Sequence, residues 1–429
     1  MNVNKIWNIL FLEERPSIGL SFFRIFVALT TGFHVIPSFF HLDDNYFSTA
    51  FKTLNDMFFT SQALALVGQS SDAMVVFFVW FFVMSWLCFL IGLYSQVSCI
   101  VMTLCCYYFY ALNCFHIGTL SWDILLVTLF LMCMTPYHGD YFSVDALRKR
   151  DPLAYQRTRP FFLQRLLQLQ IASTFFYTAL YKISNHGNWL VGNPIYYLMN
   201  YPPQGVTKNF LIKEWMAAQP IFCYWVGIFI VMTELALPFL LFNPKTRRSA
   251  ILMGFLFHIV LLLTLDVPAI FFFLFPAQLL LFIHPQRITD WINRKRALNA
   301  LSPRFKVIYD GHCQFCLRSI EQLKVMDLFS RCEYVDYQIV ANLQSLHPSL
   351  NQQVAASQMH LITPNGKIYG GFFAFRQMGW FMPMLFPLLI LMYLPFVDWI
   401  GPCVYKFIAQ NRYLLHFNHK CKDNRCFRP

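Results

Sequence analysis

The stretch YDGHCQFC, residues 309–316, decides how the chain divides, because it places a Cys-x-x-Cys pair behind nearly 300 residues of very apolar sequence. The residues before it, FKVIYD (305–310), are typical of a β-strand. Those after it, CLRSIEQLKVMDLF (316–329), follow the period of an amphipathic helix. Paired cysteines between a strand and a helix are typical of a redox site. We therefore expect a small folded domain after about residue 300.

The composition places the rest of the chain in a membrane. Of 429 residues, 57% are hydrophobic and only 13% are charged, whereas soluble proteins carry roughly 25% charged residues. Several runs of 18 or more residues hold almost no charge, which is the length that crosses a bilayer. The net charge of +12 lies on no basic helix or basic-aromatic face, so we expect no nucleic-acid partner.

Eight membrane spans are expected, although seven or nine also fit, and the charged start of the chain predicts no cleaved signal peptide. The spans are 18–37, 74–94, 96–114, 120–136, 162–183, 220–242, 248–265 and 267–284. With the N-terminus inside, most Lys and Arg residues fall in inner segments, and the outer segments hold only Lys52, Lys182, Lys208 and Lys213. This asymmetry predicts a multi-pass protein of the cell (inner) membrane with both termini in the cytoplasm.

The region after residue 300 reads as alternating strands and helices. A second strand, CEYVDY (332–337), follows the first helix, and a polar helical stretch covers 342–357. Two further strands, 359–363 and 367–371, are joined by Pro-Asn-Gly, a hairpin turn signal, and 372–379 closes as a helix. This order is the minimal thioredoxin-like plan. The apolar stretch 380–401, broken by prolines, is expected to form a buried or membrane-apposed helical hairpin on the cytoplasmic side.

The fold class follows from these two parts. We predict a polytopic α-helical membrane bundle over residues 1–300, followed by a small α/β thioredoxin-like domain over 301–429 that ends in a basic tail.

The two cysteines would stand at the start of the first helix of that domain. Unpaired backbone N–H groups and the helix dipole stabilise a thiolate there. Cys313 would be the exposed attacking sulfur, and Cys316, one turn later, would resolve the mixed disulfide. Asp310 and Gly311 would shape the turn between strand and helix.

A structural zinc site is the alternative interpretation of this pair. Cys421 and Cys426, with His419 close by, supply a second pair of candidate ligands near the end of the chain. The setting of strand, cysteine pair and amphipathic helix favours redox chemistry, and we predict no metal.

The Cys-x-x-Cys region resembles the DCC family (DUF393) of thiol-disulfide oxidoreductases, whose signature is Asp-Gly-x-Cys-x-x-Cys after a strand. The resemblance continues in MHLITPNGKIYGGFFAF (359–375) and VYKFIAQNRYLL (404–415), and covers about 304–417. It implies thiol-disulfide exchange, with a thiol or disulfide protein as partner. Where thioredoxins carry a cis-proline before the third strand, this chain has Gln358.

Charged groups within membrane spans are costly and are candidates for function. The spans hold Arg24, Asp123, Arg165, Lys182, Glu234 and His258. Arg24 and Arg165 lie near inner ends and Lys182 near an outer end, where snorkelling to the interface explains them. Glu234 and His258 lie deeper, on consecutive spans, and would pair with one another.

The stretch TALYKISNHGNWLVG (178–192) resembles the HTTM family, the membrane domain of vitamin K-dependent gamma-carboxylase. YFSVDAL (141–147), ELALPFLLF (234–242) and FLFHIVLLL (255–263) match further parts in order, so the resemblance covers about 15–290. It implies that Lys182 acts as a base toward a reduced, vitamin K-like quinone. Trp122 and Asp123 stand where the carboxylase has a histidine that supports this lysine.

Together, these features favour an integral membrane redox enzyme, with a cysteine-pair oxidoreductase domain joined to a bundle that binds a quinone-like or lipid ligand. We expect Trp189, Glu234, His258 and Asp123 to line that ligand pocket, with the lipid bilayer around it. The alternatives are a carboxylase-like quinone-dependent enzyme and a non-catalytic lipid-binding redox sensor.

The charge asymmetry generates a topology prediction. Alkaline phosphatase fused to the C-terminus should be inactive, and a fluorescent protein fused there should be bright, because the domain stays in the cytoplasm. Active phosphatase on a dark fluorescent fusion would place the cysteine pair outside and overturn the orientation.

Overall fold

The computed structural model describes residues 7–47, 70–112, 119–184, 188–201, 208 and 210–412. The chain divides into two compact units, the first comprising 1–143 and 158–285 and the second comprising 144–157 and 286–429. Residues 144–157 and 286–300, which lie within the range expected for the membrane domain, therefore group with the second unit.

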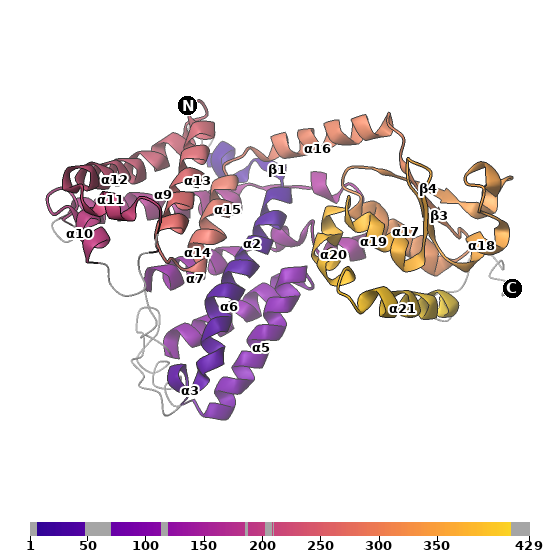
Figure 1. The fold of residues 1–429 in the computed structure, drawn as a ribbon, viewed down its shortest axis with the longest axis horizontal. Helices are drawn as coiled ribbons and strands as arrows, with labels where there is room; N and C mark the ends of the chain where they lie inside the picture. The colour runs from indigo at the N-terminus through magenta and orange to yellow at the C-terminus, as the bar shows by residue number, and fades with distance from the viewer. Residues whose placement is uncertain are drawn as a thin grey trace. The chain divides into compact units, whose positions relative to one another are not determined.

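The first unit is almost entirely helical (Figure 1). Its longer helices are α2 (Ile18–Val35), α5 (Asp72–Ile91), α6 (Ser95–Leu112), α7 (Thr119–Cys133), α9 (Phe162–Ile183), α12 (Pro220–Phe242) and α13 (Arg247–Thr264). The shorter ones are α3 (Leu42–Asn45), α10 (Pro194–Asn200), α11 (Lys213–Ala217), α14 (Ala269–Phe272) and α15 (Leu274–Leu280). A two-stranded antiparallel ribbon joins β1 (Glu14–Pro16) to β2 (Thr158–Pro160).

Each of the eight expected spans coincides with a helical segment, but a count of eight spans is not confirmed. Among the described residues, five helices are long and apolar enough to cross a membrane, or six if the broken stretch that begins at Ile270 counts as one. The helix α7 has only 15 residues. The helix α9 is long enough but carries Arg165, Lys182 and several glutamines. The last expected span is interrupted between α14 and α15.

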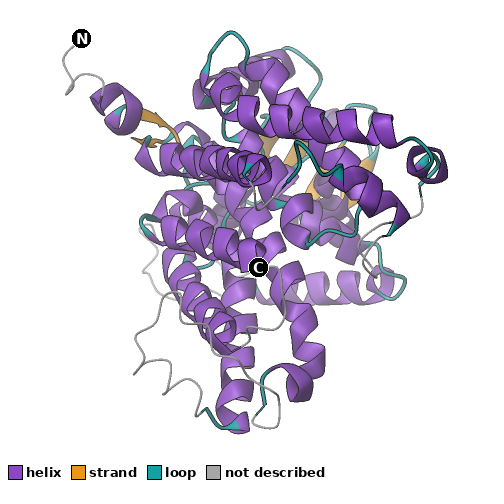
Figure 2. Ribbon diagram, turned by 90° about the vertical axis from the view of Figure 1, so that its left-hand side faces the viewer, coloured by secondary structure: helices purple, strands orange, loops and turns teal. Residues whose placement is uncertain are grey.

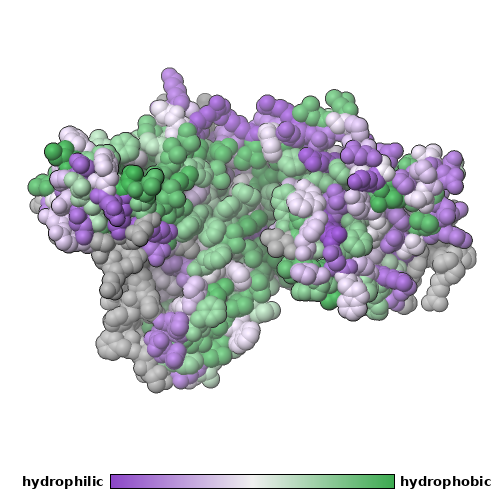
Figure 3. Space-filling view, viewed as in Figure 1, coloured by the Kyte–Doolittle hydropathy of each residue, from purple (hydrophilic) through white to green (hydrophobic). Residues whose placement is uncertain are grey.

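The outer surface of these helices suits a lipid environment. On α5, Trp80 is 66% exposed and Phe77 is 60% exposed. Apolar side chains cover much of the visible face of this unit (Figure 3). Contiguous apolar surface of this extent is rare on soluble proteins, so the chain is a multi-pass membrane protein.

Polar side chains inside this unit bond across helices. Gln164 and Gln168 of α9 both donate to the carbonyl of Leu281, at 2.6 and 2.8 Å, just where α15 has ended. The last carbonyl groups of a helix have no hydrogen-bond partner within the helix, and lipid offers no hydrogen-bond donors. The glutamines that make α9 unusually polar therefore satisfy the broken helix beside it.

Arg24 shows the same principle and corrects an expectation. The side chain is fully buried, and it donates to the carbonyl oxygens of Phe89, at 3.0 Å, and Phe142. It therefore does not snorkel to the interface. Gly92, at φ +70°, leaves the room that this guanidinium occupies, because a Cβ there would lie 1.9 Å from its Nη1.

The second unit has a four-stranded sheet in the order β4-β3-β5-β6. Its strands are β3 (Phe305–Tyr309), β4 (Cys332–Asp336), β5 (His360–Ile362) and β6 (Ile368–Gly370). β3 is parallel to β4 and antiparallel to β5, and β5 and β6 form the expected hairpin. This topology confirms the small α/β domain, and Figure 2 shows how little of the chain is strand.

Helices pack on both faces of this sheet. They are α17 (Gln314–Met326), α18 (Gln352–Ser357) and α19 (Gly371–Gly379). Neighbouring residues of β3 point to opposite faces. Val307 packs with Ile320 of α17 and Met378 of α19, whereas Ile308 packs with Ala355 of α18.

Two further helical segments belong to this unit. α8 (Val144–Lys149) leads to Arg150, whose Nη1 lies 2.9 Å from Glu321 of α17. α16 (Pro285–Ala300) carries Asn293, which accepts a 2.7 Å hydrogen bond from the Tyr155 hydroxyl.

The apolar stretch after residue 380 forms the expected pair of helices, α20 (Phe386–Met392) and α21 (Val397–Asn411). Pro395 stands in the connection between them, where a helix is hardest to continue. No residue of α21 is fully buried.

Candidate functional site

The cysteine pair lies where β3 ends and α17 begins, as the sequence predicts. Cys313 is the N-cap residue of α17, with φ −91° and ψ 113°. Its sulfur accepts the backbone N–H of Cys316, at 3.3 Å. The thiol thus takes the role that a Ser or Asp oxygen usually plays in capping a helix. Neither cysteine is in a disulfide.

This position makes the two thiols unequal. The pKa of Cys313 is lowered to about 7, mainly because the thiol of Cys316 hydrogen-bonds to its sulfur. The backbone N–H of Cys316 and the Arg412 guanidinium lower it further, whereas burial and the Asp310 carboxylate oppose them. The hydrogen bond to Cys313 raises the pKa of Cys316. When one of the two thiols is ionised, the negative charge therefore lies on Cys313 and the proton on Cys316.

The expectation that Cys313 is the exposed sulfur is wrong. Cys313 is only 1% exposed, whereas Cys316 is partly exposed. The capping conformation explains the difference, because it turns the Cys313 sulfur back over the helix end to meet the Cys316 N–H. Sequence spacing predicts a cysteine at a helix start but does not determine which sulfur faces solvent.

Two aspartates hold the loop that carries the thiols. Asp310 is 5% exposed, and its carboxylate accepts from the backbone N–H of His312, at 3.0 Å, and from the Gln338 side chain, at 3.2 Å. Asp336, at the end of β4, accepts from the backbone N–H of Gly311, at 2.9 Å. A Cβ at Gly311 would lie 1.9 Å from an Asp336 oxygen, so only glycine fits this approach.

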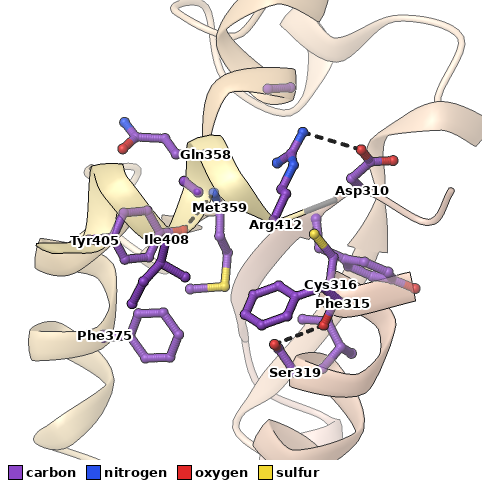
Figure 4. Close-up of a pocket in the computed structure, with 14 residues that line it drawn as sticks. Asp310, Phe315, Cys316, Ser319, Gln358, Met359, Phe375, Tyr405, Ile408 and Arg412 are labelled. Atoms are coloured by element: carbon purple, nitrogen blue, oxygen red, sulfur yellow. Dashed lines mark hydrogen bonds and ion pairs between the residues drawn. The ribbon is translucent and has the colours of Figure 1, made fainter. Parts of the chain in front are cut away.

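A cavity of about 220 Å³ opens beside Cys316 (Figure 4). Its lining is mostly apolar: Phe315, Ile320, Met359, Phe375, Tyr405 and Ile408 contribute, with Asp310 and Arg412 at one end. Cys316 and Phe315 come from α17, whereas Tyr405 and Ile408 come from α21 on the opposite wall.

Arg412 and Tyr405 are functional candidates that reasoning from single residues missed. Arg412, just after α21, lies 3.5 Å from Asp310 and donates to the carbonyl of Ala356 at 2.9 Å. The Tyr405 hydroxyl accepts the backbone N–H of Met359, at 3.2 Å. Both residues stand in the VYKFIAQNRYLL stretch, so the only signal for them was the family resemblance.

The bond between Tyr405 and Met359 limits how a partner can bind. Met359 follows Gln358, the position where thioredoxins carry their cis-proline, and its N–H is already engaged. An extended peptide that pairs with the backbone beside the cysteines would have to displace this hydroxyl.

Three of the predicted membrane-site residues lie together. The Lys182 amine lies 2.5 Å from a Glu234 oxygen, between α9 and α12. The same amine sits over the Trp189 ring, 4.7 Å from its centroid. Lys182 is therefore held in an ion pair and a cation–π contact, which a purely snorkelling side chain would not need.

The prediction that Glu234 pairs with His258 is wrong, because Glu234 bonds Lys182 instead. His258 is 1% exposed and packs against the rings of Phe175, Phe271 and Phe275. Its ring nitrogens have no hydrogen-bond partner among the described residues. Asp123 accepts a 2.6 Å hydrogen bond from the Tyr110 hydroxyl of α6.

No cluster of three or more potential metal ligands occurs among the described residues. Cys421, Cys426 and His419, the second pair and histidine of the zinc alternative, lie outside the described residues.

Comparison with known proteins identifies two families along the chain. A family model described as the HTTM domain matches residues 13–291, and one described as DCC1-like thiol-disulfide oxidoreductase matches residues 307–417. No curated protein and no solved structure matches the chain significantly.

The position of Arg412 generates a prediction. Arg412→Met should move the pH dependence of Cys313 alkylation upward and slow the reaction at pH 7 roughly three- to tenfold, because a cation that favours the thiolate is removed. The rate would be followed by mass spectrometry of the cysteine peptide between pH 5 and 10.

Arg376→Met is the matched control. It removes an arginine of the same unit that pairs with Asp398 and makes no contribution to the thiol pKa. Identical pH profiles for the Arg412 variant and the wild type would contradict this electrostatic role.

Proposed function

Since the chain belongs to the HTTM family and its second unit carries a DCC1-like domain, we propose that it is an integral membrane thiol-disulfide oxidoreductase. One observation carries the proposal. Cys313 caps α17 with a lowered pKa beside a proton-bearing Cys316, so the pair holds a thiolate ready for exchange and a thiol ready to resolve it.

The reaction consists of two exchanges. The Cys313 thiolate attacks one sulfur of a substrate disulfide, forms a mixed disulfide and releases the other substrate sulfur as a thiolate. Cys316 then loses its proton and attacks the Cys313 sulfur. The enzyme disulfide forms and the second substrate sulfur leaves. Two electrons and the Cys316 proton have then passed from the pair to the substrate, and the other substrate thiolate takes a proton from water according to the pH. A reductant of the thiol class returns the pair to the dithiol form.

The arrangement around the pair favours a small or apolar substrate over an extended peptide. The cavity of about 220 Å³ beside Cys316 has a mostly apolar lining, and the Met359 N–H is already bonded to Tyr405. A protein partner would have to carry its disulfide on an apolar loop tip that fits this cavity.

In the membrane unit, we propose that Lys182, Glu234 and Trp189 bind a quinone-like or lipid ligand. A partly buried ion pair beside an indole ring offers hydrogen bonds to a carbonyl or hydroxyl and a flat surface for a ring. For Lys182 to act as a base, its amine would first have to lose a proton. The ion pair with Glu234 would therefore have to open, or the lysine would have to pass its proton to another group. The two units belong to one chain, and this is our reason to propose that electrons pass between the thiol pair and this ligand.

Thiol turnover tests the first proposal. In detergent or nanodiscs the full chain should reduce glutathione disulfide or insulin steadily with a thiol reductant present, whereas a redox sensor would switch once and stop. Cys313→Ser should abolish turnover, and Cys316→Ser should accumulate a mixed disulfide on Cys313, because the resolving sulfur is missing.

If Cys316→Ser instead abolishes turnover and Cys313→Ser accumulates a mixed disulfide, the attacking sulfur is the more exposed one, Cys316. Absence of turnover in the wild-type protein, with stoichiometric zinc bound, would overturn the oxidoreductase proposal.

Lys182→Arg tests the membrane ligand. Arg keeps the charge and the contact with Glu234 but cannot shed a proton near neutral pH. We expect the variant to insert normally and to keep thiol turnover, yet to lose any activity that depends on the membrane ligand. Trp189→Ala should reduce the quinones or lipids that mass spectrometry finds on the purified protein. Full ligand-dependent activity of Lys182→Arg would exclude Lys182 as the base.

A further inference from the structure

The helices α20 and α21 and the turn between them expose many large apolar side chains on the second unit. They are Phe386, Leu388, Leu391, Tyr393, Leu394, Phe396, Trp399, Ile400, Val404, Phe407 and Ile408. Trp399 is 78% exposed and Phe407 is 68% exposed. Single exposed apolar side chains are ordinary on proteins, but so many on two consecutive helices mark a contact surface. We call this set the apolar stripe.

The spacing along α21 separates two faces. Residues 399, 403 and 407, with 400, 404 and 408, point outward at intervals of four. The packing face is built by other positions: Gly401 lies against Phe372, and Tyr405 bonds Met359. The apolar residues of the outward face are therefore exposed although α21 already packs against α19.

The polar residues beside the stripe are those of an interfacial helix. Lys406 is exposed, and Arg376 pairs with Asp398, which directly precedes Trp399. Trp380 donates to the Tyr393 hydroxyl, at 2.9 Å. After residue 412 the sequence continues with Lys420, Lys422, Arg425 and Arg428 against the single acid Asp423. Aromatic residues at a polar boundary with nearby cations suit an anionic lipid surface.

We propose that α20 and α21 lie in the headgroup region of the bilayer, with the apolar stripe in the acyl boundary and anionic lipid as its partner. The chain itself supports this occupant, because the first unit spans the membrane and the stripe belongs to the same chain. The prolines 383, 387 and 395 interrupt the segment, so it lies along the interface instead of crossing.

This surface would bring the thiol site to the lipid. Ile408 belongs to the apolar stripe and also lines the cavity beside Cys316, and Tyr405 and Ala409 of the same helix line it too. A molecule that partitions into the bilayer would therefore meet the cavity wall directly. The membrane contact does not rest on the proposed redox function, and its test uses no activity.

Photolabelling of the full chain in liposomes of phosphatidylethanolamine and phosphatidylglycerol tests the proposal. One aryl-diazirine probe is dissolved in the lipid and another in the water, and mass spectrometry locates the adducts. The lipid probe should label residues of the apolar stripe. Ile339, which is 81% exposed in the same unit, is the internal control and should react only with the aqueous probe.

The double variant Trp399→Asp/Phe407→Asp should reduce lipid-phase labelling of 386–408 at least fivefold, while Ile339→Asp should leave it unchanged. The substituted side chains are exposed, and an unchanged pH profile of Cys313 alkylation would verify that the unit is folded. Labelling of the stripe by the aqueous probe alone would overturn the proposal. Protection from both probes would also overturn it and would assign the stripe to a protein partner, such as a second copy of this chain.

Discussion

The hydrogen bond from the Cys316 backbone N–H to the Cys313 sulfur is the contact on which the second unit's chemistry depends. A helix start leaves N–H groups without partners. Here the Cys313 sulfur satisfies one of them, and this bond adds to the larger effect of the Cys316 thiol in lowering the pKa of Cys313. Neighbouring residues hold the loop around that contact. Asp336 accepts a hydrogen bond from the Gly311 backbone, Asp310 pairs with Arg412, and Arg412 adds positive charge near the thiolate.

The membrane unit follows a related constraint, since lipid offers no hydrogen bonds. Its buried polar groups therefore find partners on other helices, as Gln164 and Gln168 do with Leu281, Arg24 with Phe89 and Lys182 with Glu234. The last pair lies beside Trp189 in the stretch that resembles the HTTM lysine motif. It is the part of this unit where we propose that a ligand binds.

Local sequence signals predicted the second domain well. Strand-type composition, helical period and the Pro-Asn-Gly turn lie within short windows, and β3, α17 and the β5–β6 hairpin formed as expected. Features that depend on distant residues could not be predicted. Arg412 reaches Asp310 across about a hundred residues, Glu234 pairs with Lys182 and not with His258, and capping geometry buried Cys313. Hydropathy located the helical segments, but α9 and the broken α14–α15 stretch show why it did not establish the number of spans.

The central claim is that Cys313 and Cys316 form a reversible redox pair. It is tested most directly by equilibrating the purified full chain in glutathione buffers of graded potential and quantifying both cysteines by differential alkylation and mass spectrometry. The account predicts that the two sulfurs oxidise together in one two-electron transition to an internal disulfide. No internal disulfide at any potential, with both thiols protected until a chelator removes zinc, would contradict it.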